Sequence, residues 1–428
     1  MPNPIIRSIG ITGASAVVAQ GLVVLSIPLT ARLFSEEAFG VFNLFTNIAN
    51  IMVVLCHLGF MDAILSARSQ RHARRILFAI NSIHLLTVAV ATVGVFALVR
   101  FDVFGLGQLP IWLVALFPAQ IVLVSLCLQL QLLRTRFEQF GTLAASNVSL
   151  GASRASGQIL FGLLGGGVSG LVFGELLSRL VGMVTLAYPD RARLSRGVAA
   201  VFFASPTSKR LRVLSPYRAF AAVRLPTLLM VSLNIALPSL LIANLFELRE
   251  VGYFALMHLV LLAPIGLTQK AFGDVITGTF SGYYRNDRRR ALRFVLISAG
   301  LLTAASIAGA LVLIAIAPTL FTVLFGEKWA PSGVMAQYFA FAIAFMTASI
   351  PLSPILNVIE RPGIPFAFNL IQLAGFAAVY VASWSIQIEL LDVVLLLAAN
   401  IGAAHALYLA LILVRVGLSC RGDGPTTS

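Results

Sequence analysis

Long apolar stretches follow one another along almost the whole chain, and only short polar segments separate them. Most reach the roughly 20 residues that a helix needs to cross the hydrocarbon core of a bilayer, so they predict about twelve transmembrane helices. Hydrophobic residues make up 59% of the sequence and charged residues only 11%, which excludes an ordinary soluble domain. The pattern predicts an all-α integral membrane protein, with spans at 9–31, 41–65, 76–99, 110–133, 143–164, 167–188, 225–246, 251–276, 291–316, 335–358, 366–386 and 390–414.

The chain contains an internal repeat. The segment at 31–44 recurs 212 residues later at 243–256 without a gap, and in the same register Asp62 matches Asp274. A repeat with an offset near half the chain length predicts two similar membrane lobes in tandem. Paired lobes of this kind are the usual framework of alternating-access transport.

We expect two pseudo-symmetric six-helix lobes, at residues 1–188 and 225–414. A basic segment at 189–224 joins them and a short tail at 415–428 follows. The joining segment carries eight basic residues against one acidic residue, which predicts a cytoplasmic linker. Its apolar middle, 198–204, fits either a segment lying along the membrane surface or part of a solvated linker.

Basic residues are sorted between the two sides of the membrane. Of the 30 Lys and Arg residues, 23 fall in segments that are cytoplasmic if the N-terminus is inside, whereas four fall on the opposite side: Arg32, Arg100, Arg249 and Lys328. This bias predicts a multi-pass protein with both termini in the cytoplasm. The net charge of +14 is therefore interpreted as topology and contact with anionic membrane lipids, and not as nucleic-acid binding.

Ionisable groups inside the predicted spans are few, and each is a functional candidate because burying it in a membrane is costly. Arg154 lies in one span, and Glu175 and Arg179 lie four residues apart in the next. Counting residues from the glycine turn at 165–167 places all three at a similar depth. Two interpretations stay open. In the first, the three side chains form an Arg-Glu-Arg salt bridge that only holds the two helices together. In the second, one guanidinium faces a water-filled cavity and attracts a phosphate.

Further charged candidates lie near the cytoplasmic ends of the spans. Lys270 and Asp274 are four residues apart, Asp62 is the repeat-mate of Asp274, and Arg7 and Arg224 lie at the inner rims. The two aspartates can extend to water at the interface. Alternatively they mark symmetric inner gates, or one of them exchanges protons to drive a transport cycle.

The sequence shows no motif for metal binding, nucleotide binding or catalysis. The three cysteines show no metal-ligand spacing, and no nucleotide-binding loop occurs, so we expect no metal, no cofactor, no direct nucleotide binding and no catalytic residues. The histidines within or beside spans have no partners at ligand spacing, which favours packing roles for His57, His84, His258 and His405. Predicted external connections are short, which favours a carrier over an enzyme such as a membrane glycan polymerase or ligase.

The stretch from Leu29 to Phe42, the following Leu58-Gly59 and the basic loop after it resemble the opening of polysaccharide biosynthesis flippases. These form the Wzx-like branch of the multidrug/oligosaccharidyl-lipid/polysaccharide (MOP) exporter superfamily. The second half follows the same family's order of motifs, at 250–254, 264–267, 325–331 and 351–357.

The resemblance implies two six-helix bundles that form a V around a central cavity. A bacterial inner-membrane protein of this kind moves lipid-linked oligosaccharide units, carried on undecaprenyl pyrophosphate, by alternating access for the synthesis of O-antigen, capsule or exopolysaccharide. H⁺ or Na⁺ are the coupling ions to consider, and polysaccharide polymerase and export proteins are further partners. The cationic cavity candidates are Arg154, Arg179, Lys270, Arg7 and Arg224, and the coupling or gate candidates are Glu175, Asp62 and Asp274.

Two alternatives remain. A cation-coupled exporter of amphipathic small molecules, of the multidrug type, would share the superfamily but would require an acidic, aromatic-lined cavity. A membrane glycan polymerase or ligase would require sizeable external loops, and these are missing from the predicted topology.

Overall fold

The computed structural model describes the backbone of residues 4–190, 211–386 and 388–421. Helices form most of these ranges and no strand occurs within them. Helices are the expected outcome for apolar sequence in lipid, because a helix satisfies all its backbone hydrogen bonds within one segment. The predicted all-α class is confirmed.

Eleven helical stretches of the described residues are long and apolar enough to cross a membrane. Each of the twelve predicted spans corresponds to one helix or to a run of consecutive helices. The one that is not among the eleven is α6 (Phe140–Leu163), whose serines, glycines and Arg154 make it less apolar than its neighbours. The protein is therefore a multi-pass membrane protein.

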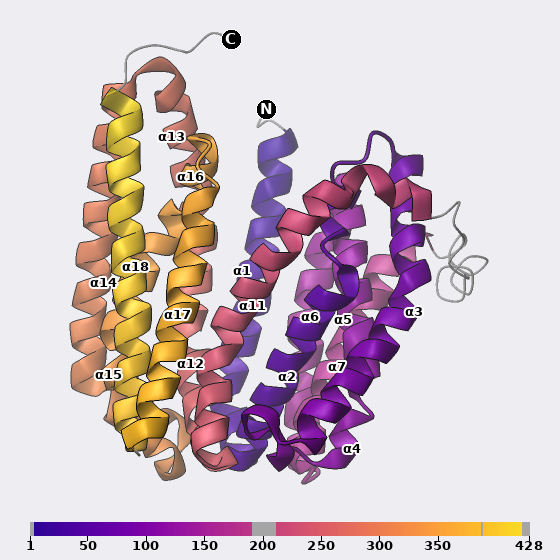
Figure 1. The fold of residues 1–428 in the computed structure, drawn as a ribbon, viewed down its shortest axis with the longest axis vertical. Helices are drawn as coiled ribbons and strands as arrows, with labels where there is room; N and C mark the ends of the chain where they lie inside the picture. Colours follow the sequence, from indigo (N-terminus) through magenta and orange to yellow (C-terminus); the bar gives the residue numbers. More distant parts are fainter. Residues whose placement is uncertain (1–3, 191–210, 387, 422–428) are drawn as a thin grey trace. The chain divides into compact units, whose positions relative to one another are not determined.

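The chain divides into two compact units, and the first comprises residues 1–252. In this unit α6 packs against both α1 and α7, while α2, α3 and α5 pack against one another (Figure 1). Its elements are α1 (Pro4–Leu33), α2 (Glu36–His57), η1 (Met61–Ile64), α3 (Gln70–Arg100), η2 (Val103–Gln108), α4 (Ile111–Val114), α5 (Phe117–Arg136), α6, α7 (Gly167–Ala187), η3 (Tyr188–Asp190), η4 (Arg212–Tyr217) and α11 (Arg218–Leu245).

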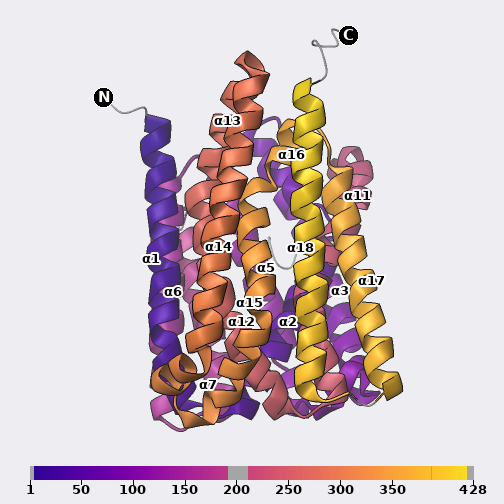
Figure 2. The ribbon, with the colours of Figure 1, turned by 90° about the vertical axis from the view of Figure 1, so that its left-hand side faces the viewer.

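The second unit comprises residues 253–428. Within it α15 packs against α14 and α18, and α18 also packs against α17 (Figure 2). Its elements are most of α12 (Leu248–Thr268), the π-helical η5 (Gln269–Gly273), α13 (Asp274–Asn286), α14 (Arg288–Phe325), η6 (Glu327–Trp329), α15 (Ala330–Ser349), η7 (Ile350–Leu352), α16 (Ile355–Val358), α17 (Gly363–Ile386) and α18 (Leu390–Arg421).

The sequence repeat coincides with the helix boundaries. Helix α2 begins at Glu36 and α12 begins 212 residues later at Leu248. The repeat-mates Gly40 and Gly252 lie where the first turns of these helices cross, because a Cβ on Gly40 would lie 3.1 Å from the Gly252 nitrogen. A Cβ on Gly252 would overlap the Glu36 carbonyl oxygen. Glycine at both positions allows the two backbones to touch.

The predicted span 41–65 is wrong at both ends. Helix α2 begins at Glu36, where the Ser35 hydroxyl accepts a hydrogen bond from the Ala38 amide at 3.2 Å and caps the helix. It ends at His57, because Leu58 adopts a φ of 50° and Gly59 a φ of 76°. The next residues form η1 and not a continuation of the helix.

Helical residues occur inside the predicted linker 189–224. Helix α11 begins at Arg218, inside the predicted linker 189–224, and η4 precedes it. Leu214 of η4 is buried in an apolar cluster with residues of η1, α3 and α5. The apolar segment 198–204 lies outside the described residues. Because α11 packs against α2 and η2 within the first unit, the predicted lobe boundaries at 188 and 225 stay a prediction.

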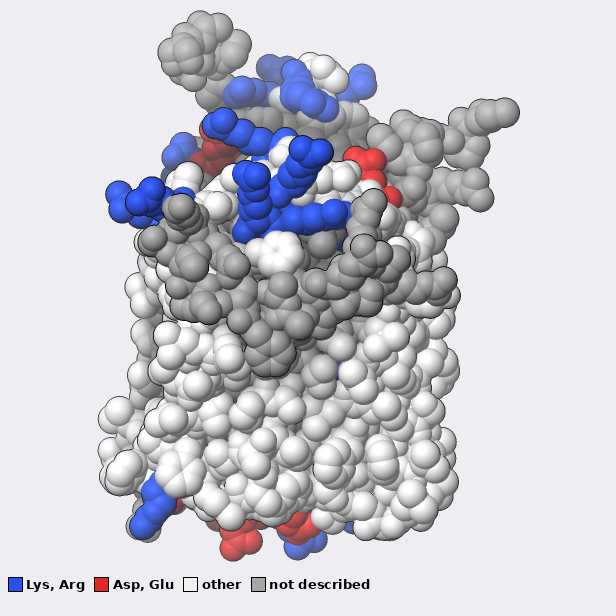
Figure 3. All heavy atoms as spheres, turned by 90° about the vertical axis from the view of Figure 1, so that its right-hand side faces the viewer, with Lys and Arg blue, Asp and Glu red and all other residues white. Residues whose placement is uncertain are grey.

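Charge is unevenly distributed over the first unit. On the face shown in Figure 3, Lys and Arg side chains gather near one end, and a wide band below them is almost free of charged side chains. Exposed arginines of this unit include Arg68 in the α2–α3 connection, Arg71 and Arg75 in the first turns of α3, Arg212 in η4 and Arg218 at the start of α11. This matches the predicted sorting of charge, while the side of the membrane on which this end lies stays a prediction.

Candidate functional site

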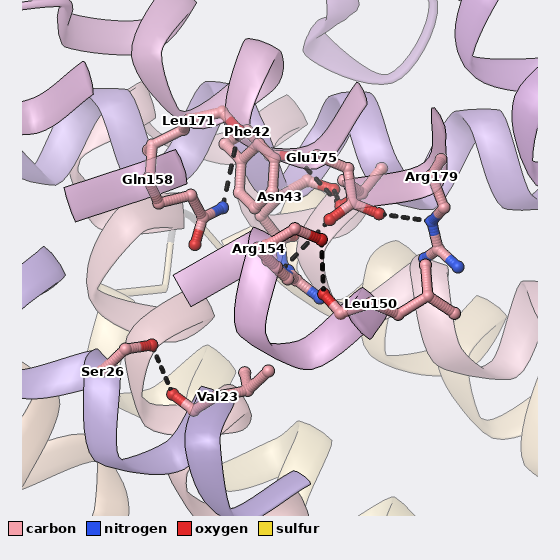
Figure 4. A network of polar contacts seen from close by, with 12 residues as sticks. Val23, Ser26, Phe42, Asn43, Leu150, Arg154, Gln158, Leu171, Glu175 and Arg179 are labelled. Atoms are coloured by element: carbon pink, nitrogen blue, oxygen red, sulfur yellow. Dashed lines mark hydrogen bonds and ion pairs between the residues drawn. The ribbon is translucent and has the colours of Figure 1, made fainter. Parts of the chain in front are cut away.

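Three charged side chains within the spans come together in the first unit. Arg154 is on α6, and Glu175 and Arg179 are on α7 (Figure 4). One Glu175 carboxylate oxygen accepts a hydrogen bond from the Arg179 Nε at 2.8 Å. The other carboxylate oxygen lies 3.1 Å from the Arg154 Nε, an ion pair that lacks the alignment of a hydrogen bond. The expected meeting of the three groups across the α6–α7 hairpin is confirmed.

Short connections and small residues build this hairpin. Helix α6 ends at Leu163 and α7 begins at Gly167, so the glycine turn holds the helices in a fixed register. A Cβ on Gly157 would lie 3.4 Å from the Cα of Gly174, which shows how closely the two helices approach. On the other side of α6, a Cβ on Gly151 would lie 2.6 Å from the Ala19 carbonyl oxygen of α1. Small residues of α6 therefore allow close packing on both sides of the helix.

The environment of the Arg154–Glu175–Arg179 triad is asymmetric. The Glu175 side chain is only 2% exposed, whereas those of Arg154 and Arg179 are 27% and 29% exposed. The side chain of Gln120 on α5 also interacts with the carboxylate, and the Arg154 guanidinium lies 5.8 Å from the centre of the Phe42 ring. The carboxylate is thus enclosed, while both arginine side chains remain partly accessible.

The chemistry of the triad follows from its charge count. One carboxylate faces two guanidiniums, so the triad carries one net positive charge inside the spanning helices. Both contacts to Glu175 use the Nε atoms. The terminal amino groups of Arg154 and Arg179 are therefore the donors that can bind a second anion, and a planar guanidinium suits a phosphate.

A second ion pair joins two candidates that are distant in sequence. Asp62 of η1 accepts a hydrogen bond from the Nε of Arg224 on α11 at 2.5 Å. Their side chains are 29% and 41% exposed, so this pair lies near water and not in the core. Gly59 lies against the same helix, since a Cβ there would lie 2.6 Å from the Ala221 carbonyl oxygen. The pair fastens the α2–α3 connection to α11.

The remaining candidates join neither the Arg154–Glu175–Arg179 triad nor the Asp62–Arg224 pair among the described residues. Asp274 is exposed at the start of α13, and no ion pair is recorded for it among the described residues. The symmetry proposed for Asp62 and Asp274 is not kept locally, because one lies in a 3₁₀ turn and the other in a helix. The side chains of Arg7 and Lys270 lie outside the described residues.

The structure reveals one polar group that sequence spacing missed. His57 of α2 and His84 of α3 stack with ring centres 5.1 Å apart, and Gln129 of α5 contacts His57. Because the residues come from three helices, no spacing along the chain could reveal their contact. Among the described residues, no group of three or more His, Cys, Asp or Glu side chains is arranged to hold a metal ion.

Comparison with known sequences gives one family match. The model of a family described as "Polysaccharide biosynthesis protein" matches residues 29–334. A search among curated proteins gave no match.

Solved structures of the MOP superfamily share the fold. An inward-facing multidrug resistance MATE family transporter is 13% identical with a TM-score of 0.70, covering 96% of this chain and 100% of its own. The lipid II flippase MurJ, in an inward closed conformation, is 10% identical with a TM-score of 0.67, covering 95% of this chain and 90% of its own. A MOP superfamily transporter from Pyrococcus furiosus is 12% identical with a TM-score of 0.58, covering 97% of each chain. At these identities the likeness shows the fold alone, which is that of MOP transporters.

Proposed function

Because the chain belongs to the family of polysaccharide biosynthesis proteins, we propose that it flips lipid-linked oligosaccharides across the bacterial inner membrane. The substrate is an oligosaccharide on undecaprenyl pyrophosphate, destined for O-antigen, capsule or exopolysaccharide. The fold and the family are those of membrane transporters and not of catalysts. Transport proceeds by alternating access, with both chain termini in the cytoplasm.

A physical barrier makes such a carrier necessary. A glycan with many hydroxyl groups and a charged pyrophosphate cannot cross about 30 Å of hydrocarbon unaided, since each unpaired polar group costs several kcal/mol there. The polyprenyl tail stays in lipid and needs no polar path. The carrier therefore has to supply water, hydrogen-bond partners and compensating positive charge for the headgroup only.

The observation that carries this proposal is the Arg154–Glu175–Arg179 triad. Its net positive charge lies inside the spanning helices, and its partly exposed arginine side chains keep terminal donors beyond the Nε atoms that contact Glu175. A pyrophosphate would bind these donors while Glu175 holds both arginines in position. Because the carboxylate is shared, the site releases the anion more easily than two unpaired arginines would.

The other charged candidates complete the path. Lys270, Arg7 and Arg224 attract the headgroup at the entrance, and opening of the Asp62–Arg224 pair accompanies a gating step. Asp274 is the corresponding group in the second half. Polysaccharide polymerase and export proteins then receive the flipped unit, and anionic lipids contact the basic loops.

Reconstitution in liposomes tests this function. Purified protein is incorporated with a fluorescent lipid-pyrophosphate oligosaccharide, and exposure of the label in the outer leaflet is followed with an impermeant quencher. We expect a protein-dependent increase in the exposure rate. No increase over empty liposomes contradicts the proposal, and transport of cationic amphiphiles in its place identifies a multidrug exporter.

Substitution of the arginines tests the site. Arg179→Gln should reduce the flipping rate at least tenfold, because a hydrogen bond to a charged group contributes about 1.5–3 kcal/mol. Arg154→Gln should act in the same direction. The matched control is Arg290→Gln, since Arg290 is 75% exposed and pairs with Asp287 at the surface. Normal flipping by both site variants, with unchanged folding, would show that these arginines only pack the helices.

A further inference from the structure

A second polar site is enclosed between α2, α3 and α5 of the first unit. His57, His84, Gln129 and Asn81 are 3%, 5%, 1% and 4% exposed. Each belongs to a helix that spans the membrane, and none of them takes part in the Arg154–Glu175–Arg179 triad. Buried polar side chains in such positions are costly unless they bind something or serve a function.

The contacts of His57 fix its tautomer. Its Nδ1 lies 2.7 Å from the Val53 carbonyl oxygen, which can only accept, so Nδ1 carries the proton. Its Nε2 then presents a lone pair, to which the Gln129 amide donates at 3.2 Å. A neutral His57 is thus held by both ring nitrogens, in a fixed orientation.

His84 is placed differently. Its ring stacks on His57 with an angle of 21° between the planes. Among the described residues the Cys56 carbonyl oxygen is the backbone group with which His84 interacts, and neither ring nitrogen makes a hydrogen bond of good geometry, so one nitrogen keeps a lone pair. Both polar atoms of Asn81, one turn earlier on α3, and the Oε1 of Gln129 are also without partners there. A group of buried and unsatisfied polar atoms of this kind indicates a bound species.

The geometry favours a proton over a metal ion. Two nearly parallel stacked rings do not direct their nitrogen lone pairs toward one point, as a shared metal ion would require. A single added proton fits well, because an imidazolium lies favourably over the face of a neutral aromatic ring. A second proton would place two positive charges on rings 5.1 Å apart.

We propose that His57 and His84 form a binding site for one transported proton, with His84 as the ring that takes it. The proton adds to a lone pair of the His84 ring, and no other bond changes. The inference rests on the proposed function, because the proton supplies the energy for flipping the lipid-linked oligosaccharide.

The surroundings of the pair contain few other charged groups. On α2 the neighbour is Cys56, whose carbonyl oxygen accepts a hydrogen bond from the Thr87 hydroxyl of α3 at 3.1 Å. On α5 Cys127 donates to the Arg179 carbonyl oxygen of α7 at 3.1 Å, and the arginines near the end of the helix, Arg134 and Arg136, donate to the carbonyl oxygens of Leu186 and Ala67. The charged groups of α7 are Glu175 and Arg179, which pair with each other. Asp62 of η1 pairs with Arg224 of α11, and the other charged residues of α11 and of η4 are the exposed Arg218 and Arg212.

Helix α5 connects the proton site to the anion site. Gln129 contacts His57, Cys127 contacts the backbone of α7, and Gln120 interacts with Glu175. A change of charge at His84 that moves the Gln129 amide therefore acts on the same helix that supports the triad. This continuity gives the proton a physical means to alter anion binding.

Transport under an imposed pH gradient tests the proposal. Wild-type proteoliposomes should flip the labelled lipid-linked oligosaccharide at least fivefold faster with a proton gradient than without one. His84→Gln and His84→Phe, the second of which keeps a stacked ring, should lose this stimulation, so that their flipping rates are the same with and without the gradient. His405→Gln is the control, since His405 is a buried histidine of the second unit that hydrogen-bonds Ser349 at 2.8 Å, and it should keep the stimulation.

NMR of the histidines in wild-type protein tests the proton site directly, even if a variant fails to fold. Solid-state NMR of wild-type protein with ¹⁵N-labelled histidine, assigned by single His→Gln variants, should show His57 as the Nδ1–H tautomer at alkaline pH. On acidification, His57 and His84 together should take up one proton. Two protons or none, or stimulation that persists in both His84 variants, would overturn the proton site. Absence of all flipping by wild-type protein contradicts the proposed function, while the NMR titration still decides the proton site.

Discussion

At the scale of single residues, one enclosed carboxylate organises the charged centre of the first unit. Glu175 is 2% exposed and contacts the Nε atoms of both Arg154 and Arg179. Burying a carboxylate is costly, and the two neighbouring guanidiniums, together with the Gln120 side chain, offset that cost. Glu175 is therefore a positioning residue, while the arginines offer the donors that a phosphate needs.

Replacement of Glu175 by glutamine should destabilise the protein. The variant leaves two guanidiniums beside a neutral amide, and we expect a loss of about 2–3 kcal/mol, below the range for fully buried pairs because both arginines are partly exposed. Thermal unfolding in detergent measures the effect. Combining Glu175→Gln with Arg179→Gln restores the charge balance, so the double variant should lose less than the sum of the single losses. Strictly additive losses would show that the groups do not interact.

At the scale of elements, the crossing of α2 and α12 depends on glycine. The two helices start at equivalent points of the repeat, and Gly252 lies against the Glu36 backbone. The Asp62–Arg224 pair similarly fastens η1 to α11. Each contact ties an early segment of the chain to a segment near the midpoint, so that α11 belongs to the first unit.

An alanine at position 252 should weaken this crossing. The added methyl group meets backbone atoms that cannot rotate away, so Gly252→Ala should cost about 1–3 kcal/mol of stability, as overpacking generally does. The control is Gly266→Ala on the same helix, where a Cβ would meet nothing within 4 Å. That substitution should be neutral or stabilise α12 by up to about 1 kcal/mol. Equal unfolding temperatures for the two variants would rule out the close crossing.

At the scale of the whole molecule, the distribution of basic residues predicts how the chain is inserted. The exposed arginines of the α2–α3 connection and of the segment after α16 should face the cytoplasm. The fold and the family agree with a multi-pass transporter. Neither of them shows which end of the spanning helices faces the cytoplasm. Insertion therefore needs its own measurement.

Labelling of single cysteines in intact cells provides that measurement. Arg100→Cys should react with an impermeant maleimide from outside, whereas Arg68→Cys and Arg361→Cys should react only after the cells are permeabilised. All three positions are exposed. The background carries Cys420→Ser, and the two remaining native cysteines are buried. Labelling in the reverse pattern would show that the chain is inserted in the opposite orientation, with the predicted inner gate residues on the outer side.

The sequence was sufficient for features that depend only on the order and spacing of residues along the chain. Apolar run length identified the spans, and the 212-residue repeat located equivalent helices. The orientation that charge counts along the loops predict stays a prediction. The triad could also be predicted, because α6 and α7 are joined by a short glycine turn and residue counting from the turn gives depth. Helix ends were less accurate, since the backbone turn at Leu58 and Gly59 leaves no mark in hydropathy.

Tertiary structure alone decided which helix faces meet. Asp62 and Arg224 are 162 residues apart, and His57, His84 and Gln129 come from three helices. Helices that are apolar on every side carry little information about their rotation, because lipid and protein neighbours satisfy them equally well. The rotation is fixed only when close packing and hydrogen bonds select one arrangement, and that selection placed the two histidine rings face to face.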